Sequence, residues 1–226
     1  MAKSRKELIK GPDEFITLTG KLIRWARNNT KPLIIGTCAF FVLIALISVY
    51  RIYNTHRERS AAVLLSQNLT AYLEARNLEN NSDKALATVR PEFERLIAEY
   101  GGQPAGRAGR LLLAHVALSG HASDEAIALY RKALSDFSGD PSLHNILRNG
   151  LATAYMQKGD QGAAIEHFQA VATGKSTMLK DAALFHLGYL YGSLGEAEKS
   201  RQAYLQLKSD FPDSMYSDIA REKAAG

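Results

Sequence analysis

The sequence predicts an all-α protein in which one apolar N-terminal helix precedes an array of paired helices, an α-solenoid. Three observations support this fold class. An uncharged apolar run near the N-terminus is long enough to span a bilayer. No Gly or Pro occurs between Gly36 and Pro91, and small and large residues recur at helical spacing through the C-terminal half. Because Gly and Pro are the strongest helix breakers, their absence favours a long continuous helix.

The apolar run extends from Leu33 to Tyr50, LIIGTCAFFVLIALISVY, and contains no charged residue. As a helix it would be about 27 Å long, close to the bilayer's hydrocarbon thickness of about 30 Å. We therefore predict a single transmembrane helix over residues 32–53. The alternatives are a buried core helix and a cleavable signal peptide. A signal peptide would have a shorter leader and small residues after the run, whereas bulky residues follow here, so we expect a retained anchor.

Residues 1–31 form a basic leader ahead of this run. They hold eight of the 28 Lys and Arg residues but only three of the 23 Asp and Glu residues, which leaves twenty of each sign in the rest of the chain. Flanks rich in Lys and Arg are retained in the cytoplasm. The predicted topology is therefore a single pass through the membrane, with a cytoplasmic N-terminus and an exported C-terminal part.

The second half of the leader has an amphipathic pattern. Leu22, Trp25 and Ala26 fall on one helical face, and the basic residues fall on the opposite face. This pattern is typical of a helix that lies in the headgroup layer, although a solvated basic tail is the alternative. The predicted membrane-interface residues are Lys21, Arg24, Trp25, Arg27, Tyr50 and Tyr53.

Residues 54–104 are predicted to extend the anchor helix and to complete a divergent first helix pair. Leu65, Leu69 and Tyr72 keep helical spacing beyond the apolar run. The stretch NLENNSDKA then supplies turn residues, with Ser82 or Asp83 as the N-cap of a helix that ends near Tyr100. The glycine-rich stretch GGQPAGRAG is the clearest loop.

A 34-residue frame that starts at Asp181 shows the repeat pattern most clearly. Large, large, small and large residues occupy the buried side of a first helix, a glycine ends it, and a second helix follows before a closing proline. In order, the residues that carry this pattern are Leu184, Leu187, Gly188, Tyr191, Gly195, Ser200, Tyr204, Leu207 and Pro212. The pattern resembles the tetratricopeptide repeat, which implies two antiparallel helices that approach closely at their small residues.

The same frame fits at Arg107 and at Asn145, and three repeats are about the minimum for a stable array. The predicted organisation is a leader (1–31), an anchor (32–53), a helical extension with a divergent helix pair (54–104), a repeat region (105–214) and a polar C-terminal cap (215–226). The repeat region contains three repeats, 107–140, 145–178 and 181–214.

The triplet Gly174, Lys175 and Ser176 has the form of the end of a phosphate-binding loop. However, Gln169 stands where that motif requires its first glycine, and the preceding residues have helical rather than strand spacing. We expect the triplet to lie in the connection between two repeats, with Gly174 as a helix C-cap.

Other residue patterns do not favour catalysis or cofactor binding. Cys38 is the single cysteine, and the six histidines lack the spacing of a zinc helix. The near-neutral body lacks the clustered positive charge that nucleic-acid binding needs. The sequence therefore predicts no enzyme, metal, cofactor, small-molecule substrate or nucleic acid, and it predicts protein partners.

Resemblance to tetratricopeptide proteins implies a concave groove lined by the first helix of each repeat. The corresponding side chains are mostly apolar and include no Lys or Arg, which departs from the basic clamp that tetratricopeptide co-chaperones use for C-terminal carboxylates. Extended or helical apolar protein segments are the expected ligands, and core packing is the alternative for each residue. The predicted protein-binding residues are Leu111, His115, Leu118, Ile146, Asn149, Thr153, Met156, Phe185 and Tyr189.

Taken together, the amphipathic leader, single span and exported repeats resemble the membrane-anchored ancillary subunits of the bacterial Sec translocon. That resemblance implies an anchor in the inner (cell) membrane and a periplasmic C-terminal repeat domain. It also implies contacts with translocon subunits, periplasmic chaperones or exported polypeptides. Two alternatives remain open. One is an envelope scaffold for cell-division, outer-membrane or cytochrome assembly, and the other is an organelle-type targeting receptor with cytosolic repeats.

Overall fold

In the computed structural model, which describes residues 14–79 and 82–225, the described residues form ten α-helices and no strand. The all-α fold class is therefore confirmed. The contacts divide the chain into two units, residues 1–56 and residues 57–226. The four basic residues among the first ten positions lie outside the described residues.

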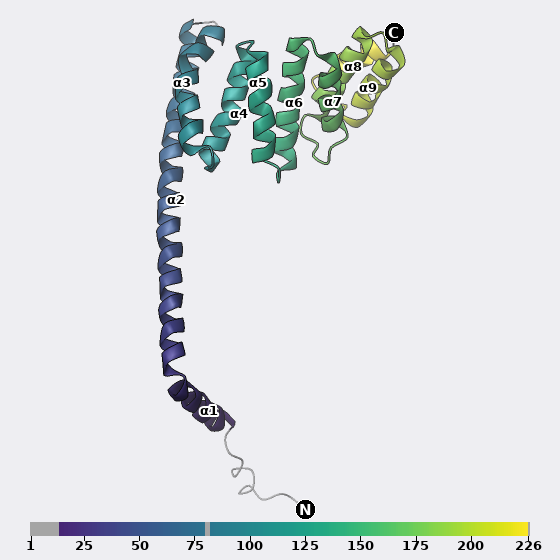
Figure 1. The fold of residues 1–226 in the computed structure, drawn as a ribbon. Coiled ribbons are helices and arrows are strands. Elements are labelled where there is room, and N and C mark those ends of the chain that lie inside the picture. The colour runs from purple at the N-terminus through teal and green to yellow at the C-terminus, as the bar shows by residue number, and fades with distance from the viewer. Residues whose placement is uncertain (1–13, 80–81, 226) are drawn as a thin grey trace, which may run out of the picture. The chain divides into compact units, whose positions relative to one another are not determined.

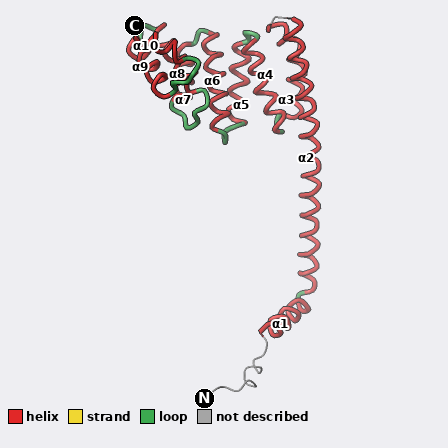
Figure 2. Tube along the Cα trace, turned by 180° about the vertical axis from the view of Figure 1, so that it is seen from behind, coloured by secondary structure: helices red, strands yellow, loops and turns green. Residues whose placement is uncertain are grey.

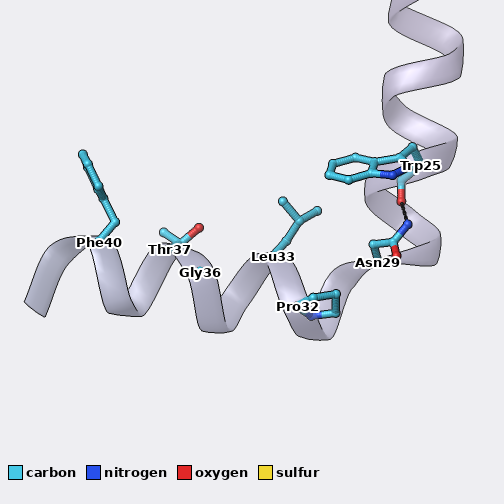
Figure 3. A pocket seen from close by; sticks show the side chains of 7 residues that line it. All are labelled: Trp25, Asn29, Pro32, Leu33, Gly36, Thr37 and Phe40. Carbon is cyan, nitrogen blue, oxygen red and sulfur yellow. Dashed lines mark hydrogen bonds between the residues drawn. The ribbon is translucent and has the colours of Figure 1, made fainter.

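The first unit contains helix α1 (Glu14–Asn28) and the beginning of helix α2 (Thr30–Glu79), with Asn29 between them. Pro32 has no amide hydrogen to donate to the carbonyl of Asn28 four residues earlier, so the helical hydrogen bonds are interrupted here. Asn29 closes the end of α1, because its backbone N and its Nδ2 both donate to the carbonyl of Trp25, at 3.0 and 2.9 Å. The chain changes direction at this point (Figure 3).

Helix α2 continues for 50 residues without interruption. Its N-terminal half carries the apolar run, and an 18-residue window of it is apolar enough to cross a membrane by length and composition. None of that window is buried within the protein. The run is therefore not the core helix of this structure.

The second unit begins with the C-terminal part of α2, which packs against α3 (Ser82–Tyr100) through a shared apolar cluster. Tyr72 and Ala75 of α2 belong to the same buried cluster as Val89 and Phe93 of α3. The Glu58 carboxylate of α2 also accepts a hydrogen bond from the backbone N of Ala105, at 3.2 Å. The end of α2 is thus the first helix of the array.

Three further helix pairs follow, and each helix packs against the next one in the chain (Figure 1). The pairs are α4 (Pro104–Ser119) with α5 (Ser123–Asp136), α6 (Pro141–Lys158) with α7 (Gln161–Ala172), and α8 (Lys180–Ser193) with α9 (Ala197–Asp210). A last helix, α10 (Ser217–Ala225), packs on α9. Seen from behind, the connections lie at the ends of the helices (Figure 2).

Close approach between helices depends on glycines that face aromatic rings. A Cβ atom on Gly188 of α8 would lie 2.6 Å from the Tyr204 ring of α9, and one on Gly150 of α6 would lie 2.4 Å from the Tyr130 ring of α5. Any side chain at these positions would push the two helices apart. The small positions of the repeat therefore set the distance between neighbouring helices.

Helices α6 and α8 end in the left-handed conformation that favours glycine, at Gly159 (φ 84°) and Gly195 (φ 78°). The expectation that Gly174 is a C-cap was wrong, because Thr173 caps α7 and Gly174 follows it without a positive φ. Crowding restricts Gly174 instead, since a Cβ there would lie 3.1 Å from the Ala170 carbonyl oxygen.

The connection that contains the Gly-Lys-Ser triplet follows helix α7 and is held by side chains of α6. Asn145 donates through Nδ2 to the carbonyls of Ser176 and Met178, at 3.1 and 2.8 Å. The hydroxyls of Ser142 and Ser176 lie 3.2 Å apart. These bonds account for the connection without a bound nucleotide.

Replacing Phe168 with Ala should lower the free energy of unfolding by about 3–5 kcal/mol, because the side chain is fully buried and its ring stacks on His186 at 4.8 Å. Chemical denaturation of the full chain, followed by circular dichroism, would measure the change. Leu205→Ala on α9 is the control, because Leu205 is 40% exposed and should cost far less. Equal losses in the two variants would contradict the assigned packing.

Candidate functional site

A cavity of about 470 Å³ lies between the first helices of two successive repeats, α4 and α6. We call it the groove cavity. Six of the nine predicted protein-binding residues line it: Leu111, His115, Leu118, Ile146, Asn149 and Thr153. These six side chains therefore share one cavity in the structure, and their role in binding stays a prediction.

Four further residues line the groove cavity and were not predicted: Leu112, Tyr130, Gly150 and Leu179. Tyr130 comes from α5, a second helix of a repeat, and reaches the cavity because Gly150 leaves space beside its ring. Leu179 lies in the connection before α8 and adopts a left-handed conformation with φ 59°. In the sequence, only the glycine in the middle of α6, Gly150, indicated that a side chain from another helix would approach α6 closely there.

Most of the cavity wall is apolar, and a few polar groups face it. The Oδ1 atom of Asn149 is buried and has no hydrogen-bond partner among the described residues. The Thr153 hydroxyl is already used, because it donates to the Asn149 carbonyl at 2.9 Å. Burial raises the pKa of the Tyr130 phenol, so this group remains neutral. An apolar cavity with an unpartnered amide oxygen suits a polypeptide segment, whose backbone N–H groups can donate to that oxygen.

The other three predicted groove residues lie elsewhere. Met156 packs against the main apolar core. Phe185 stacks on Tyr216 at 4.6 Å, so the structure places it in the packing between the last repeat and the residues before α10 rather than in the groove cavity. Tyr189 is 58% exposed on α8. The position of Phe185 in the repeat frame could not reveal that Tyr216, near the C-terminus, would stack on it.

The predicted membrane-interface residues are exposed within the described structure. They are Lys21, Arg24, Trp25, Arg27, Tyr50 and Tyr53. A second cavity of about 410 Å³ lies at the junction of α1 and α2, where Leu33, Thr37 and Phe40 point to the same side as Trp25 (Figure 3). The indole of Trp25 is 57% exposed. The junction thus presents an apolar surface beside a basic helix.

Two partly buried histidines contribute to packing, whereas three other histidines of the described residues are exposed. His167 stacks on Tyr155 at 5.6 Å, and burial lowers the pKa values of His167 and His186. Cys38 is exposed and free. No group of three or more His, Cys, Asp or Glu side chains that could hold a metal occurs among the described residues.

The paired helices and the cavity across their first helices define a helical repeat protein of the solenoid class. The chain belongs to the family described as "Tetratricopeptide repeat-like domain", whose match covers residues 24–214. Repeats of this kind are generally protein interaction modules. The matched region begins ahead of the apolar run and therefore includes it together with the repeats.

Two solved structures share the fold. A tetratricopeptide repeat protein from Parabacteroides merdae is 14% identical, with a TM-score of 0.56 over 71% of this chain and 59% of its own. The nearly identical TPR-like repeats of a Podosopora anserina putative kinesin light chain are 16% identical, with a TM-score of 0.56 over 73% of this chain and 84% of theirs. At these identities the likeness shows the fold alone. No curated protein matches the chain.

Two substitutions on α6 should change stability in opposite directions. Asn149→Leu should raise the free energy of unfolding by about 1–3 kcal/mol, because it removes a buried amide oxygen that has no partner. Asn145→Leu should lower it, because both hydrogen bonds of Asn145 Nδ2 to the α7–α8 connection are lost. Thermal unfolding of the full chain would compare the variants. A loss of stability in both variants would show that the amide oxygen of Asn149 has a hydrogen-bond partner in the folded protein.

Proposed function

We propose that this protein is a membrane-anchored interaction module of the bacterial envelope, which binds exported polypeptides or their chaperones near the Sec translocon. The observation that carries the proposal is the exposed apolar run at the start of α2, the same helix whose C-terminal part begins the repeat array. Joining an apolar segment of membrane-spanning length to a protein-binding domain makes a tethered binding surface.

Exposure of the apolar run supports a membrane environment. Side chains such as Phe41, Leu46 and Val49 are more than half exposed, and leaving so many apolar groups in water is unfavourable at about 25 cal/mol per Å². A hydrocarbon environment removes that cost, and the continuous helix satisfies the backbone hydrogen bonds within the run. The family match also begins before the run, which supports an anchor retained with the repeats rather than a cleaved signal peptide.

The junction between α1 and α2 supports an interfacial position for α1. Pro32 lets the chain turn immediately before the apolar run, and the exposed Trp25 suits the boundary between headgroups and hydrocarbon. Lys21, Arg24 and Arg27 would then contact anionic headgroups on the cytoplasmic side. The excess of Lys and Arg before the run gives the same orientation, with the repeats in the periplasm.

The groove cavity supports a polypeptide ligand. Its leucine and isoleucine side chains can pack against an apolar residue of an extended or helical segment, and the Asn149 amide can bond to a backbone group. Tethering raises the effective concentration of the cavity for partners in or near the same membrane, so weak contacts can suffice. This fits newly exported chains, translocon subunits and periplasmic chaperones.

The same fold and groove are compatible with two other functions. An envelope scaffold for cell-division, outer-membrane or cytochrome assembly would differ only in its partners. A targeting receptor of an organelle outer membrane would expose the repeats to the cytosol. The experiments below distinguish both from the proposal.

Alkaline phosphatase fused after Gly226 should be active in a bacterial host, because this enzyme requires export, and a green fluorescent protein fusion at the same site should be dark. Fusions to a truncated chain that ends at Asn29 should show the reverse, because they would remain in the cytoplasm. Fluorescence from the full-length fusion without phosphatase activity would overturn the orientation and favour the receptor.

Photo-crosslinkers placed at Leu111 and Tyr189 should capture translocon subunits, periplasmic chaperones or nascent exported chains in cells. Leu111 lines the groove cavity, and Tyr189 is exposed on the first helix of the last repeat. Lys208, exposed on α9, is the control position. Mass spectrometry would identify the products. Enrichment of division or outer-membrane assembly proteins alone would favour the scaffold, and equal products at Lys208 would argue against a binding groove.

A further inference from the structure

In the first repeat, a buried ion pair joins the two helices. The guanidinium of Arg110 on α4 is paired with the carboxylate of Asp136 at the end of α5, and the two side chains are 9% and 14% exposed. Arg107 also donates to the backbone carbonyl of Asp136, at 3.3 Å. In the 34-residue frame, Arg110 occupies the fourth position and Asp136 the thirtieth. This pair shows which chemistry satisfies an arginine at that position.

The second repeat keeps the arginine and lacks the carboxylate. Arg148 on α6 occupies the fourth position of its frame, and Gly174 occupies the thirtieth. Arg148 is half-buried, and no hydrogen bond or ion pair satisfies it among the described residues. Its charge instead contributes, after burial, to the lowered pKa of His167. None of the Arg148 nitrogens is among the buried atoms that lack a partner, so the guanidinium is open to solvent and to an acidic group from outside the chain.

A cavity of about 360 Å³ lies where the second repeat lacks that carboxylate. We call it the basic cavity. His144, Arg148 and Lys175 line it, and Gly174 forms part of its wall. The Nε2 atom of His144 is buried without a hydrogen-bond partner among the described residues. Donor groups from α6 and from the α7–α8 connection therefore converge on one space.

Neighbouring polar groups do not already satisfy these donors. Asp140 is the nearest acidic residue along α6, and its Oδ1 accepts the backbone N–H groups of Ser142 and Leu143 at 2.9 and 3.0 Å, as the N-cap of the helix. At the end of α7, the carbonyl of Gln169 accepts from Thr173, and that of Val171 accepts from Gly174. The Arg148 guanidinium and the His144 Nε2 atom thus remain available to a ligand.

We propose that the basic cavity binds a carboxylate of a protein partner, an Asp or Glu side chain, in the place that Asp136 fills in the first repeat. The planar guanidinium of Arg148 matches a carboxylate with two parallel hydrogen bonds, and His144 and Lys175 supply further donors. A single negative charge suits the site better than a phosphate dianion, because the Asp140 carboxylate lies one helical turn from His144 and repels added negative charge.

This site is separate from the groove cavity. Residues 144, 145 and 148 of α6 line the basic cavity, while residues 146, 149 and 153 line the groove cavity, so the two sets occupy different faces of one helix. The inference does not rest on the proposed function. A partner could contact both faces, or two partners could bind at once, and crosslinks at Leu111 would be unaffected by loss of the basic cavity.

The test uses the full chain in a nonionic detergent, labelled with 13C in its histidine side chains. The probe is N-acetyl-aspartate N-methylamide, which carries one carboxylate, titrated at constant ionic strength. The His144 resonance, assigned with His144→Gln, should shift with saturation. In Arg148→Gln the half-saturating concentration should rise about tenfold or more, as expected for a lost hydrogen bond to a charged group. Lys175→Gln, in an exposed loop, should give a smaller rise.

Arg201→Gln is the matched control, because it removes the same charge on α9, where Arg201 pairs with Glu198 of its own helix. It should bind the probe like the unmodified chain. Unchanged half-saturation in Arg148→Gln, or a His144 shift that ionic strength alone reproduces, would overturn the proposal. Inorganic phosphate that saturates the site more tightly than the carboxylate would overturn the choice of ligand. Absence of any saturable shift of the His144 resonance would overturn the proposal that the basic cavity binds a carboxylate.

Discussion

Contact between an aromatic ring and a glycine on the neighbouring helix is the interaction on which the array depends. Gly188 receives the Tyr204 ring within the last repeat, and Gly150 receives the Tyr130 ring between the first and second repeats. The two contacts bring helices together at a distance that no larger residue permits, and the remaining large side chains fill the space beside them. The second contact also shapes the candidate site, because Tyr130 can reach the groove cavity only across a residue without a side chain.

The groove cavity shows the cost that a binding surface imposes on a folded protein. Leucine and isoleucine side chains that face an open space gain less packing than core residues do, and Asn149 leaves a buried amide oxygen without a partner. Asn145, one turn earlier on the same helix, donates two hydrogen bonds through Nδ2 to hold the next connection. Two asparagines one turn apart on α6 thus differ in use, and the one whose amide oxygen has no partner, Asn149, is the better candidate for binding.

Sequence reasoning predicted the parts of the structure that depend on residues close together in the chain. Periodicity in Leu184, Leu187 and Tyr191 was sufficient to identify a repeat helix, and the absence of Gly and Pro was sufficient to predict that α2 is continuous. What it missed depends on residues brought together from distant positions. Tyr130 entered the cavity from another helix, Phe185 was covered by Tyr216, and Gly174 was restricted by the Ala170 carbonyl rather than by its own φ. Spacing within one repeat cannot show which neighbour will approach.

Differences between the three repeats indicate which residues of this chain have a role beyond packing. The frame position of Gly188 keeps a small residue in every repeat, since Ala114 and Ala152 occupy it in the first and second. The fourth and thirtieth positions carry Arg110 and Asp136 in the first repeat, Arg148 and Gly174 in the second, and Leu184 and Asp210 in the third. Only the first combination satisfies itself as an ion pair, and the third replaces the arginine with an apolar residue. The second retains the arginine and lacks the carboxylate, so the Arg148 guanidinium stays open to a partner from outside the chain.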